Sequence, residues 1–344
     1  MIGLVTMRTI EWKDGMVITI DQSKLPLREV HLQMKTCEEV ALSIEEMKIR
    51  GAPLIGAAAA YGLALTAYHL KAKTREEAIR LLEDCAERLR RTRPTAVNLF
   101  WAIDRMMNRA YNALGGVEEV KKAVIEEEKR IADEDAEANR SIGRYGSTLI
   151  KDGDTVMTHC NAGALATVDY GTALGVIRAA WEEGKKIKVI ATETRPKLQG
   201  ARLTSYELNR DGIPVTLITD NMVGYVMSKG LVDLVVVGAD RIVKDAVINK
   251  IGTYTIAIVA KEHGVPFYVA APTSTFDLKH FSGEVTIEER SADEVKGFRS
   301  ERTAPEGVKA LNPAFDITPM RYITAIITER GIVRPQELDS NRPK

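Results

Sequence analysis

The residues best suited to chemistry are Cys160 and Asp240, because each follows a short apolar run that is typical of a buried strand. The small residues of the Asn-Ala-Gly segment after Cys160 would let a ligand approach a thiol at the floor of a cleft. Burial at a strand end would raise the pKa of the Asp240 carboxyl toward values useful to a general acid. The structural alternatives are a packed cysteine and a helix-capping aspartate.

Cationic residues stand at predicted helix starts and favour an anionic ligand. Arg50 precedes Gly51 and Ala52 in the stretch IRGAP, and Arg93 stands directly before Pro94. An arginine at a helix N-terminus opposes the helix dipole unless it holds an anion, although a surface arginine is the alternative. The stretch INKIGTY places a further amide and a further cation, Asn249 and Lys250, ahead of a Gly-Thr turn. Together these groups suggest a small phosphorylated polyol as ligand.

The second half of the chain supplies the elements that would position Cys160 and Asp240. Short apolar runs alternate with helical segments, which predicts a parallel sheet with helices on both faces; the runs are residues 154–160, 188–194, 214–219, 232–240 and 266–271. Ligands bind at the carboxyl ends of such strands. Polar residues follow every run: His159, Asn161, Glu193, Thr194, Arg195, Asp220, Asn221, Arg241 and Thr273. By strand alternation His159 points away from Cys160, so we expect it to be structural.

The first half predicts a hairpin and then helices. Residues 8–21 should turn at Lys13–Gly15, and Thr36 with Glu39 and Thr74 with Glu77 fit helix capping boxes. Pro94 should open a helix over residues 95–114, and residues 117–146 form a long charged connector helix. We therefore predict an α/β protein with a mostly helical N-terminal domain over residues 1–145 and a parallel-sheet domain over residues 146–344.

Composition excludes several classes of protein. The 48 basic and 48 acidic residues cancel, which disfavours nucleic-acid and membrane-surface binding. The apolar run Leu54–Leu70 is rich in alanine and glycine, and we expect it to be a buried helix rather than a membrane span. The start of the chain lacks the pattern of a signal peptide.

Three cysteines without a CxxC pair support neither a disulfide framework nor a zinc cluster. We expect Cys37 and Cys85 to be packed core residues, and the protein to work in a reducing cytoplasm. The five scattered histidines form no metal-ligand pattern. The glycine spacing of a dinucleotide-binding loop is missing, so we expect neither a metal nor a cofactor.

An ordered set of motifs resembles the methylthioribose-1-phosphate isomerase family of methionine salvage. That family belongs with the regulatory subunits of translation initiation factor 2B and the archaeal ribose-1,5-bisphosphate isomerases. The resemblance covers residues 8 to 335 and rests on these stretches: IRGAP, RPTAVNL, THCNAG, TETRPKLQGARLT, TDNM, GADRI, NKIGTY, VAAPTSTFD, IEER and NPAFDITP. One departure is the segment VKDAVINK, which is shorter than the family pattern and lacks its Gly-Asp turn.

The resemblance implies an aldose-ketose isomerase, usually a homodimer, that acts on 5-methylthioribose 1-phosphate. The fold it implies is a mostly helical N-terminal domain on a Rossmann-like catalytic domain over residues 146–344. It implies that Cys160 and Asp240 are catalytic. It also implies the residues that contact the substrate: Arg50, Gly51, Ala52, Arg93, Gln199, Asn249 and Lys250. Whether Cys160 takes a proton or stabilises a hydride shift stays open. The alternative functions are a ribose-1,5-bisphosphate isomerase and a non-catalytic regulatory subunit.

Overall fold

The structure is a computed structural model that describes residues 8–94, 96–298 and 301–338. It divides into two compact units, which we name the helical unit and the sheet unit. The helical unit holds the described part of residues 5–140 together with residues 163–171, and the sheet unit holds residues 141–162 and the described part of residues 172–344. The boundary between the two units, after residue 140, lies within the predicted connector helix over residues 117–146.

The helical unit begins with the predicted hairpin, which the structure confirms. Strands β1 (Ile10–Lys13) and β2 (Met16–Ile20) pair antiparallel, and β3 (His31–Met34) pairs with β2. Asp14 and Gly15 form the turn with φ values of 49° and 75°. A two-residue turn with positive φ at both positions matches the twist of the flanking strands.

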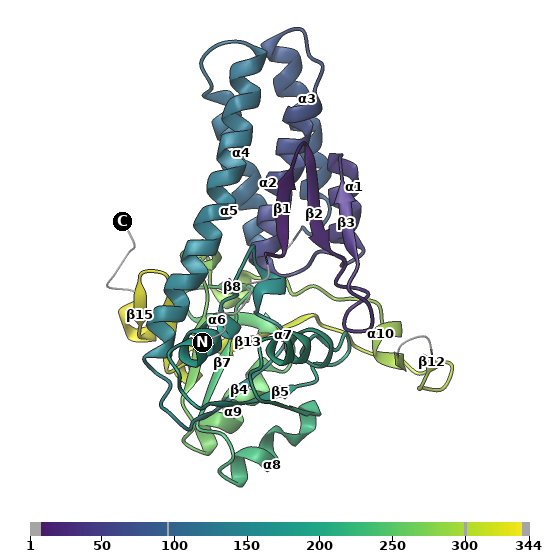
Figure 1. The fold of residues 1–344 in the computed structure, drawn as a ribbon. Coiled ribbons are helices and arrows are strands. Elements are labelled where there is room, and N and C mark those ends of the chain that lie inside the picture. The colour runs from purple at the N-terminus through teal and green to yellow at the C-terminus, as the bar shows by residue number, and fades with distance from the viewer. Residues whose placement is uncertain (1–7, 95, 299–300, 339–344) are drawn as a thin grey trace. The chain divides into compact units, whose positions relative to one another are not determined.

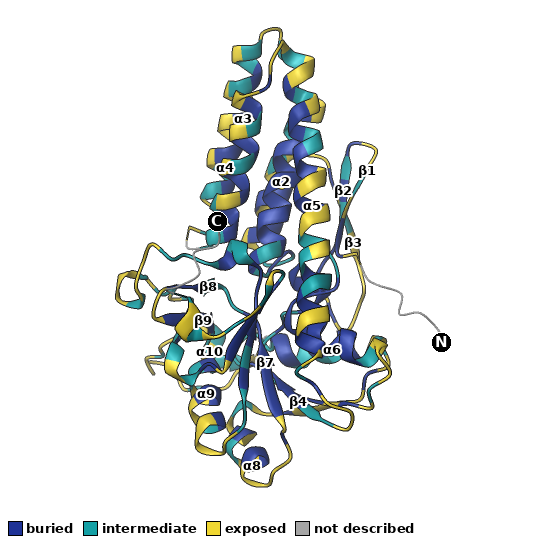
Figure 2. Ribbon diagram, turned by 90° about the vertical axis from the view of Figure 1, so that its left-hand side faces the viewer, coloured by how far each residue is buried: buried dark blue, intermediate teal, exposed yellow. Residues whose placement is uncertain are grey.

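The helices of this unit begin where the sequence places caps. Thr36 and Glu39 form a complete capping box, and the Thr74 side chain accepts a hydrogen bond from the Glu77 N–H. The alanine- and glycine-rich helix α2 is buried on nearly all sides (Figure 2), as expected. Within the described residues, no helix is long and apolar enough to cross a membrane. The helices are α1 (Cys37–Glu45), α2 (Ala52–His69), α3 (Arg75–Arg90), α4 (Val97–Tyr111) and α5 (Val117–Ser147).

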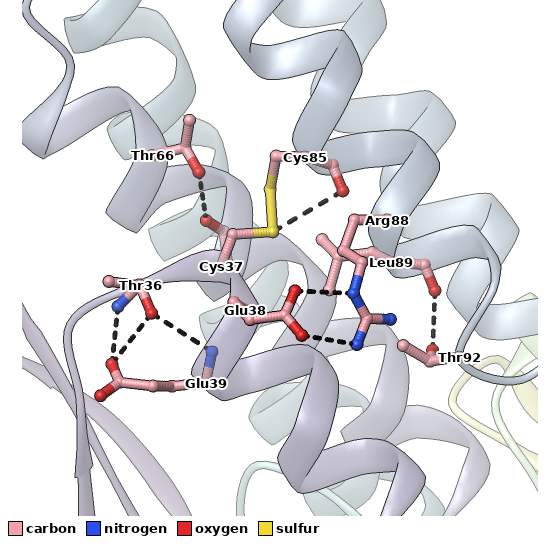
Figure 3. Close-up of a disulfide and its surroundings, with 10 residues drawn as sticks. Thr36, Cys37, Glu38, Glu39, Thr66, Cys85, Arg88, Leu89 and Thr92 are labelled. Carbon is pink, nitrogen blue, oxygen red and sulfur yellow. Dashed lines mark hydrogen bonds and ion pairs between the residues drawn. A yellow bond between two sulfur atoms is a disulfide. The ribbon is translucent and has the colours of Figure 1, made fainter.

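A disulfide between Cys37 and Cys85 joins α1 to α3 (Figure 3). The expectation that the chain forms no disulfide was therefore wrong. The two cysteines are 48 positions apart in the sequence, yet their Cα atoms lie 6.2 Å apart because α1 and α3 pack together. Spacing along the chain does not reveal such a pair, since only the packing of the helices brings the sulfur atoms together. The expectation that Cys85 is a core residue was correct, because its side chain is buried.

The sheet unit contains a seven-stranded sheet in the order β15-β14-β10-β7-β4-β5-β6. Figure 1 labels four of its strands, β15, β7, β4 and β5. Six strands of this sheet, β4, β5, β6, β7, β10 and β14, pair parallel, and β15 is antiparallel, so the predicted parallel sheet is confirmed. The five predicted runs supply β4 (Thr155–Thr158), β5 (Lys188–Thr192), β6 (Val215–Ile218), β7 (Leu234–Val237) and β10 (Phe267–Ala270). We did not predict the two remaining strands, β14 (Ala325–Thr328) and β15 (Gly331–Val333).

Apolar side chains cover both faces of this sheet. Val235 and Val237 pack on one face with α8 (Val223–Ser228) and α9 (Thr253–Glu262). Val236 packs on the other face with α6 (Ala173–Glu182) and α7 (Ser205–Arg210). Alternation along one strand therefore serves two cores, which explains why the central strands read as continuous apolar runs.

A smaller antiparallel sheet completes the sheet unit, in the order β13-β9-β8. Strand β8 (Arg241–Ile242) leads into β9 (Ala246–Lys250) through a tight turn at Lys244 and Asp245, and β13 is Phe315–Pro319. The segment VKDAVINK thus forms a short hairpin that carries Asn249 and Lys250. The short elements α10 (Asp293–Lys296), β11 (Gly297–Phe298) and β12 (Glu301–Arg302) lie between these strands in the sequence.

Candidate active site

The polar residues that follow the parallel strands lie along one edge of the seven-stranded sheet. Because parallel strands end on the same side, their carboxyl ends meet at this edge. Cys160 follows β4 and Asp240 follows β7, and these two strands are direct neighbours in the sheet (Figure 1). Strand β5, which precedes Thr194, flanks β4 on the other side. The fold therefore brings the ends of the strands that carry Cys160, Asp240 and Thr194 together.

Cys160 has a left-handed backbone that two threonine hydroxyls hold. Its φ is 63°, a conformation that residues other than glycine rarely adopt. The Cys160 N–H donates to Thr194 Oγ1 at 2.9 Å, and Thr204 Oγ1 donates to the Cys160 carbonyl oxygen at 2.5 Å. The side chain is half-buried and takes no part in a disulfide. A thiol is thus available at a backbone position that is fixed on both sides.

Asp240 lies three residues after the end of β7. All residues of β7 are buried, and Asp240 itself is half-buried. Its N–H donates to the carbonyl oxygen of Ile248 at 3.0 Å, which ties the end of β7 to β9. The carboxyl group therefore follows a dry strand and sits beside the hairpin that carries Asn249.

Gln199 carries a buried polar atom that no group of the described residues satisfies. The residue is 3% exposed, and its Oε1 atom has no hydrogen-bond partner among the described residues. It directly precedes a π-helical turn, Gly200–Thr204, which packs against the end of β5. A Cβ atom at Gly200 would lie 1.8 Å from the Thr192 carbonyl oxygen, so only glycine fits there. A buried acceptor without a donor is the type of group that a ligand hydroxyl satisfies.

Asn249 and Lys250 end strand β9. Asn249 is buried, and its side chain donates to Thr253 Oγ1 at 3.0 Å. Lys250 Nζ donates to the Ala314 carbonyl oxygen at 2.9 Å and lies 4.7 Å from the Phe315 ring centroid.

The N-terminal N–H groups of α9 are already occupied. The N–H groups of Gly252 and Tyr254 donate to the carboxylate of Asp316, at 2.7 and 3.1 Å. Burial raises the pKa of Asp316 to about 6. The Gly-Thr turn therefore presents fewer open N–H groups than the sequence suggested, and Asp316 caps the helix.

Arg50, Gly51 and Ala52 form the entry to α2 in the helical unit. Arg50 is 6% exposed, and its Nε donates to Gln22 Oε1 at 2.8 Å. Gly51 has a φ of 103°, and a Cβ atom there would lie 2.6 Å from the Ala166 Cα atom. Ala52 is the first residue of the helix. The glycine is therefore required both by its φ and by the close approach of the chain.

Arg93 lies in the turn before α4 and is half-buried. The predicted helix start at Pro94 was wrong, because α4 begins at Val97. Thr95 lies outside the described residues. A Cβ atom at Gly56 would lie 2.8 Å from the Asn98 carbonyl oxygen, so the first turns of α2 and α4 are in close contact. Arg93 and the entry to α2 therefore lie at the same end of the helical unit.

The nine predicted site residues are thus divided between the two units. Cys160, Gln199, Asp240, Asn249 and Lys250 belong to the sheet unit, and Arg50, Gly51, Ala52 and Arg93 belong to the helical unit. Within the described residues, no group of three or more histidine, cysteine or acidic side chains could hold a metal ion.

His159 is structural, as alternation predicted. Its side chain is 2% exposed, and its Nε2 atom lies 2.8 Å from the Ile251 carbonyl oxygen. Burial lowers the pKa of His159, so the ring is neutral near pH 7. Because a carbonyl only accepts, Nε2 carries the proton and Nδ1 accepts from Thr192 Oγ1 at 2.6 Å.

Sequence reasoning missed the buried polar groups behind Cys160. The Asn161 side chain donates to Glu207 Oε1 at 2.9 Å, and Glu207 pairs with Arg178 at 2.8 Å. Arg178 also pairs with Asp211 at 2.6 Å. The available signal was an arginine inside the apolar helix stretch ALGVIRAAW, since a buried charge requires a partner. Nothing in the sequence identified Thr204, because its role depends on the π-helical turn.

Comparison with known proteins gives a consistent result. The family model described as the initiation factor 2 subunit family matches residues 48–335. A methylthioribose-1-phosphate isomerase of Thermosipho melanesiensis is 57% identical over 329 residues, which cover 95% of each chain. A crystal structure of 5-methylthioribose 1-phosphate isomerase from Pyrococcus horikoshii has a TM-score of 0.91 at 46% identity and covers 97% of this chain and 95% of that one. A crystal structure described as the delta subunit of translation initiation factor eIF-2B from A. fulgidus has a TM-score of 0.88 at 52% identity and covers 97% and 98%.

Proposed function

Since the chain belongs to the initiation factor 2 subunit family, we propose that it converts 5-methylthioribose 1-phosphate into 5-methylthioribulose 1-phosphate. This aldose-ketose isomerisation is a step of methionine salvage. Two relatives, 57% and 46% identical to this chain and aligned over nearly its whole length, are named for this activity. The structural observation that carries the proposal is the placement of Cys160 and Asp240 after the neighbouring strands β4 and β7.

Asp240 is the general acid of this proposal. The anomeric oxygen of a sugar 1-phosphate carries the phosphoryl group, so the ring cannot open as a free aldose does. Asp240 in its protonated form gives its proton to the ring oxygen as the bond between that oxygen and C1 breaks. This role requires that the Asp240 carboxyl group be protonated when the substrate binds.

Cys160 acts on the hydrogen that moves from C2 to C1. In one route its thiolate takes the C2 proton and returns it to C1; in the other, it stabilises the cation through which a hydride shifts. Both routes end when the C2 hydroxyl gives its proton to the Asp240 carboxylate and becomes the ketone. Neither route needs an external oxidant, because C1 is reduced as C2 is oxidised. The fixed backbone of Cys160 suits either route, since both demand a sulfur at a defined distance from C2.

The remaining residues bind the substrate in this proposal. Arg50, Arg93 and Lys250 hold the phosphate, and the backbone N–H groups of Gly51 and Ala52 assist at the start of α2. Gln199 and Asn249 hydrogen-bond sugar hydroxyls. The buried Gln199 Oε1 atom has no hydrogen-bond partner within the part of the chain that the structure describes, which supports its assignment.

We also propose that the protein is a homodimer that works in the cytoplasm. Segment 217–231 carries four exposed apolar side chains, Leu217, Met222, Tyr225 and Leu231. Exposed apolar side chains gathered in one short segment are typical of an interface. A sugar phosphate is charged and does not cross a membrane unaided, so its isomerase should share the compartment in which the substrate is made.

One observation favours a second function, a regulatory subunit of a translation initiation factor. The A. fulgidus structure described as such a subunit is 52% identical to this chain. This function does not require a thiol at residue 160 or an acid at residue 240. Capture of an initiation factor by the tagged protein, without isomerase activity, would favour it.

The direct test is incubation of the purified protein with 5-methylthioribose 1-phosphate labelled with ¹³C at C2. We expect NMR to show the C2 signal moving to the ketone region. A parallel reaction with ribose 1,5-bisphosphate measures the preference between the two sugars. No ketose from the first sugar under conditions in which the protein is folded would refute the proposed function.

A further inference from the structure

The loops that follow β4 and β5 contain unusual backbone conformations. Cys160 and Thr194 have φ values of 63° and 65°. For a β-branched residue such as threonine, positive φ is a true outlier that costs backbone stability. Such conformations persist only where the surrounding structure holds them. The two outliers are bonded to each other through the Cys160 N–H, so the same contacts hold both residues.

On one side, a directed chain of hydrogen bonds leads away from Cys160. The Cys160 N–H donates to Thr194 Oγ1, which lies 3.3 Å from Thr192 Oγ1. Thr192 donates to the neutral His159 ring, so its hydroxyl is left to accept from Thr194. The carboxylate of Asp220 accepts from the Thr194 N–H at 2.8 Å and fixes its backbone. The Thr194 hydroxyl hydrogen therefore points to Thr192, whose carbonyl oxygen at 3.4 Å is a second acceptor, and toward Cys160 this hydroxyl accepts.

On the other side, Thr204 holds the carbonyl group of Cys160. Thr204 is fully buried at the end of the π-helical turn, and its hydroxyl accepts from the Asn161 side chain at 3.2 Å while it donates to Cys160. Single-turn π-helices occur frequently at functional sites. Because this turn starts directly after Gln199, Thr204 fixes Cys160 against the turn that follows the proposed substrate-binding amide.

We propose that Thr194 and Thr204, which we name the threonine clamp, are positioning residues that set the Cys160 sulfur for reaction. The clamp holds Cys160 at its N–H and at its C=O, so the left-handed backbone and hence the direction of the side chain are fixed. This proposal rests on the proposed function for its kinetic consequence alone. Neither threonine needs to touch the substrate.

The test compares Thr204→Val with Thr204→Ser. Valine has the shape of threonine but no hydroxyl, so it releases the Cys160 carbonyl, whereas serine keeps the donor. The matched control is Thr328→Val, because Thr328 is also buried in the sheet unit and donates to the Gly331 carbonyl oxygen at 3.0 Å without contact to Cys160. The Thr194→Val and Thr194→Ser pair repeats the test on the N–H side.

Two measurements are made on each variant. The first is kcat and KM with 5-methylthioribose 1-phosphate. The second is the rate at which iodoacetamide alkylates Cys160 between pH 6 and pH 10, followed by mass spectrometry of the peptide. A displacement of the sulfur of about 1 Å should lower kcat on the order of 10- to 100-fold with little change in KM. The dependence of the Cys160 alkylation rate on pH should change in Thr204→Val. In Thr204→Ser it should match that of the unchanged protein.

Unchanged kcat and an unchanged alkylation profile in both valine variants would overturn the clamp. Equal losses in Thr204→Val and Thr204→Ser would overturn it as well, because the hydroxyl would then not be the cause. A loss of kcat in Thr328→Val as large as that in Thr204→Val would also overturn the clamp, because the loss would then be a general effect of removing the hydroxyl of a buried threonine. If the unchanged protein has no isomerase activity, the proposed function fails, and the alkylation profiles alone decide the clamp.

Discussion

The helical unit and the sheet unit differ in the features that set them apart from ordinary helices and strands: a disulfide and helix caps in the first, and backbone conformations with positive φ beside Cys160 in the second. In the helical unit, the disulfide joins two helices, and the side chains of Thr36 and Thr74 cap the starts of α1 and α3. In the sheet unit, every described non-glycine residue with positive φ lies in the loops after β4 and β5, at Cys160, Thr194 and Leu198. The costly conformations of this unit thus stand where we place the chemistry.

This difference separates stability from reactivity. The disulfide and the caps of the helical unit lower the freedom of the chain or satisfy helix ends, and neither operation involves a reacting atom. The loops of the sheet unit give up backbone stability to hold a thiol in one direction. We therefore expect changes to the disulfide or the caps to alter the free energy of unfolding with little effect on kcat. Changes in the loops after β4 and β5 should lower kcat with little effect on the free energy of unfolding.

The largest expected effect tests the sheet unit. Cys160→Ser and Asp240→Asn should each lower kcat on the order of 100-fold or more, because each removes a group that acts on the reacting atoms. The thermal unfolding midpoint should change little, since both side chains are half-buried at the ends of strands. Calorimetry and the NMR assay measure the two quantities on the same samples. Near-normal kcat in either variant would remove that residue from the proposed site.

The disulfide should provide the largest effect on stability in the helical unit. The Cys37→Ser, Cys85→Ala variant should lose about 3–4 kcal/mol of unfolding free energy, because the bond closes a loop across 48 positions. Urea unfolding with and without dithiothreitol measures the loss, and the reductant should have no further effect on the variant. We expect kcat at 25 °C to stay within about twofold of the unchanged protein, as for a change that leaves the reacting groups in place. Three thiols titrated in the denatured, unreduced protein would contradict the bond.

Local signals in the sequence predicted most of the fold. Thr36 with Glu39, Thr74 with Glu77 and the Asp14-Gly15 turn each act on residues within four positions, so their patterns are readable without tertiary structure. The Cys37–Cys85 bond could not be predicted in this way, because it depends on the packing of two helices.

The residues of the candidate site also divide into those that a local sequence pattern predicts and those whose contacts depend on the tertiary structure. Cys160 and Asp240 were identifiable because each follows an apolar run, and the strand order then placed those runs side by side. Thr204 was not identifiable, because its contact with Cys160 depends on a turn 44 positions later in the chain. The sequence does contain a signal for β14 and β15, namely a β-branched run, a Glu-Arg-Gly turn and a second apolar pair. We did not predict these strands from it.

A buried carboxyl group gives the helical unit a pH dependence. Burial raises the pKa of Asp135 to about 7 from the ordinary value of 3.8. Between these pH values the folded protein keeps a proton that the unfolded chain has released, so stability falls as the pH rises from about 4 to about 7. The loss over that window is on the order of 3 kcal/mol.

Asp135→Asn tests this assignment. Asparagine can still accept the hydrogen bond that the Val168 N–H donates to Asp135 at 2.7 Å, but it does not titrate. The variant should therefore lose less unfolding free energy between pH 4 and pH 7 than the unchanged protein does. Parallel urea titrations at each pH measure the difference. Equal slopes for the two proteins would show that Asp135 does not titrate in this window.

The smallest expected effect is the loss of a helix cap next to the disulfide. Thr36→Ala removes the side chain that accepts from the Glu39 N–H at 3.2 Å, a change that ordinarily costs about 1 kcal/mol. Cys37 is the next residue, and its bond to Cys85 holds the first turn of α1 when the cap is lost. The cost should therefore be smaller in the oxidised protein than in the Cys37→Ser, Cys85→Ala background, and a double-mutant cycle measures that coupling. Thr36→Ser, which keeps the acceptor, is the control. Equal costs in both backgrounds would show that the cap and the disulfide stabilise α1 independently, and a fall in kcat would break the separation between the two units.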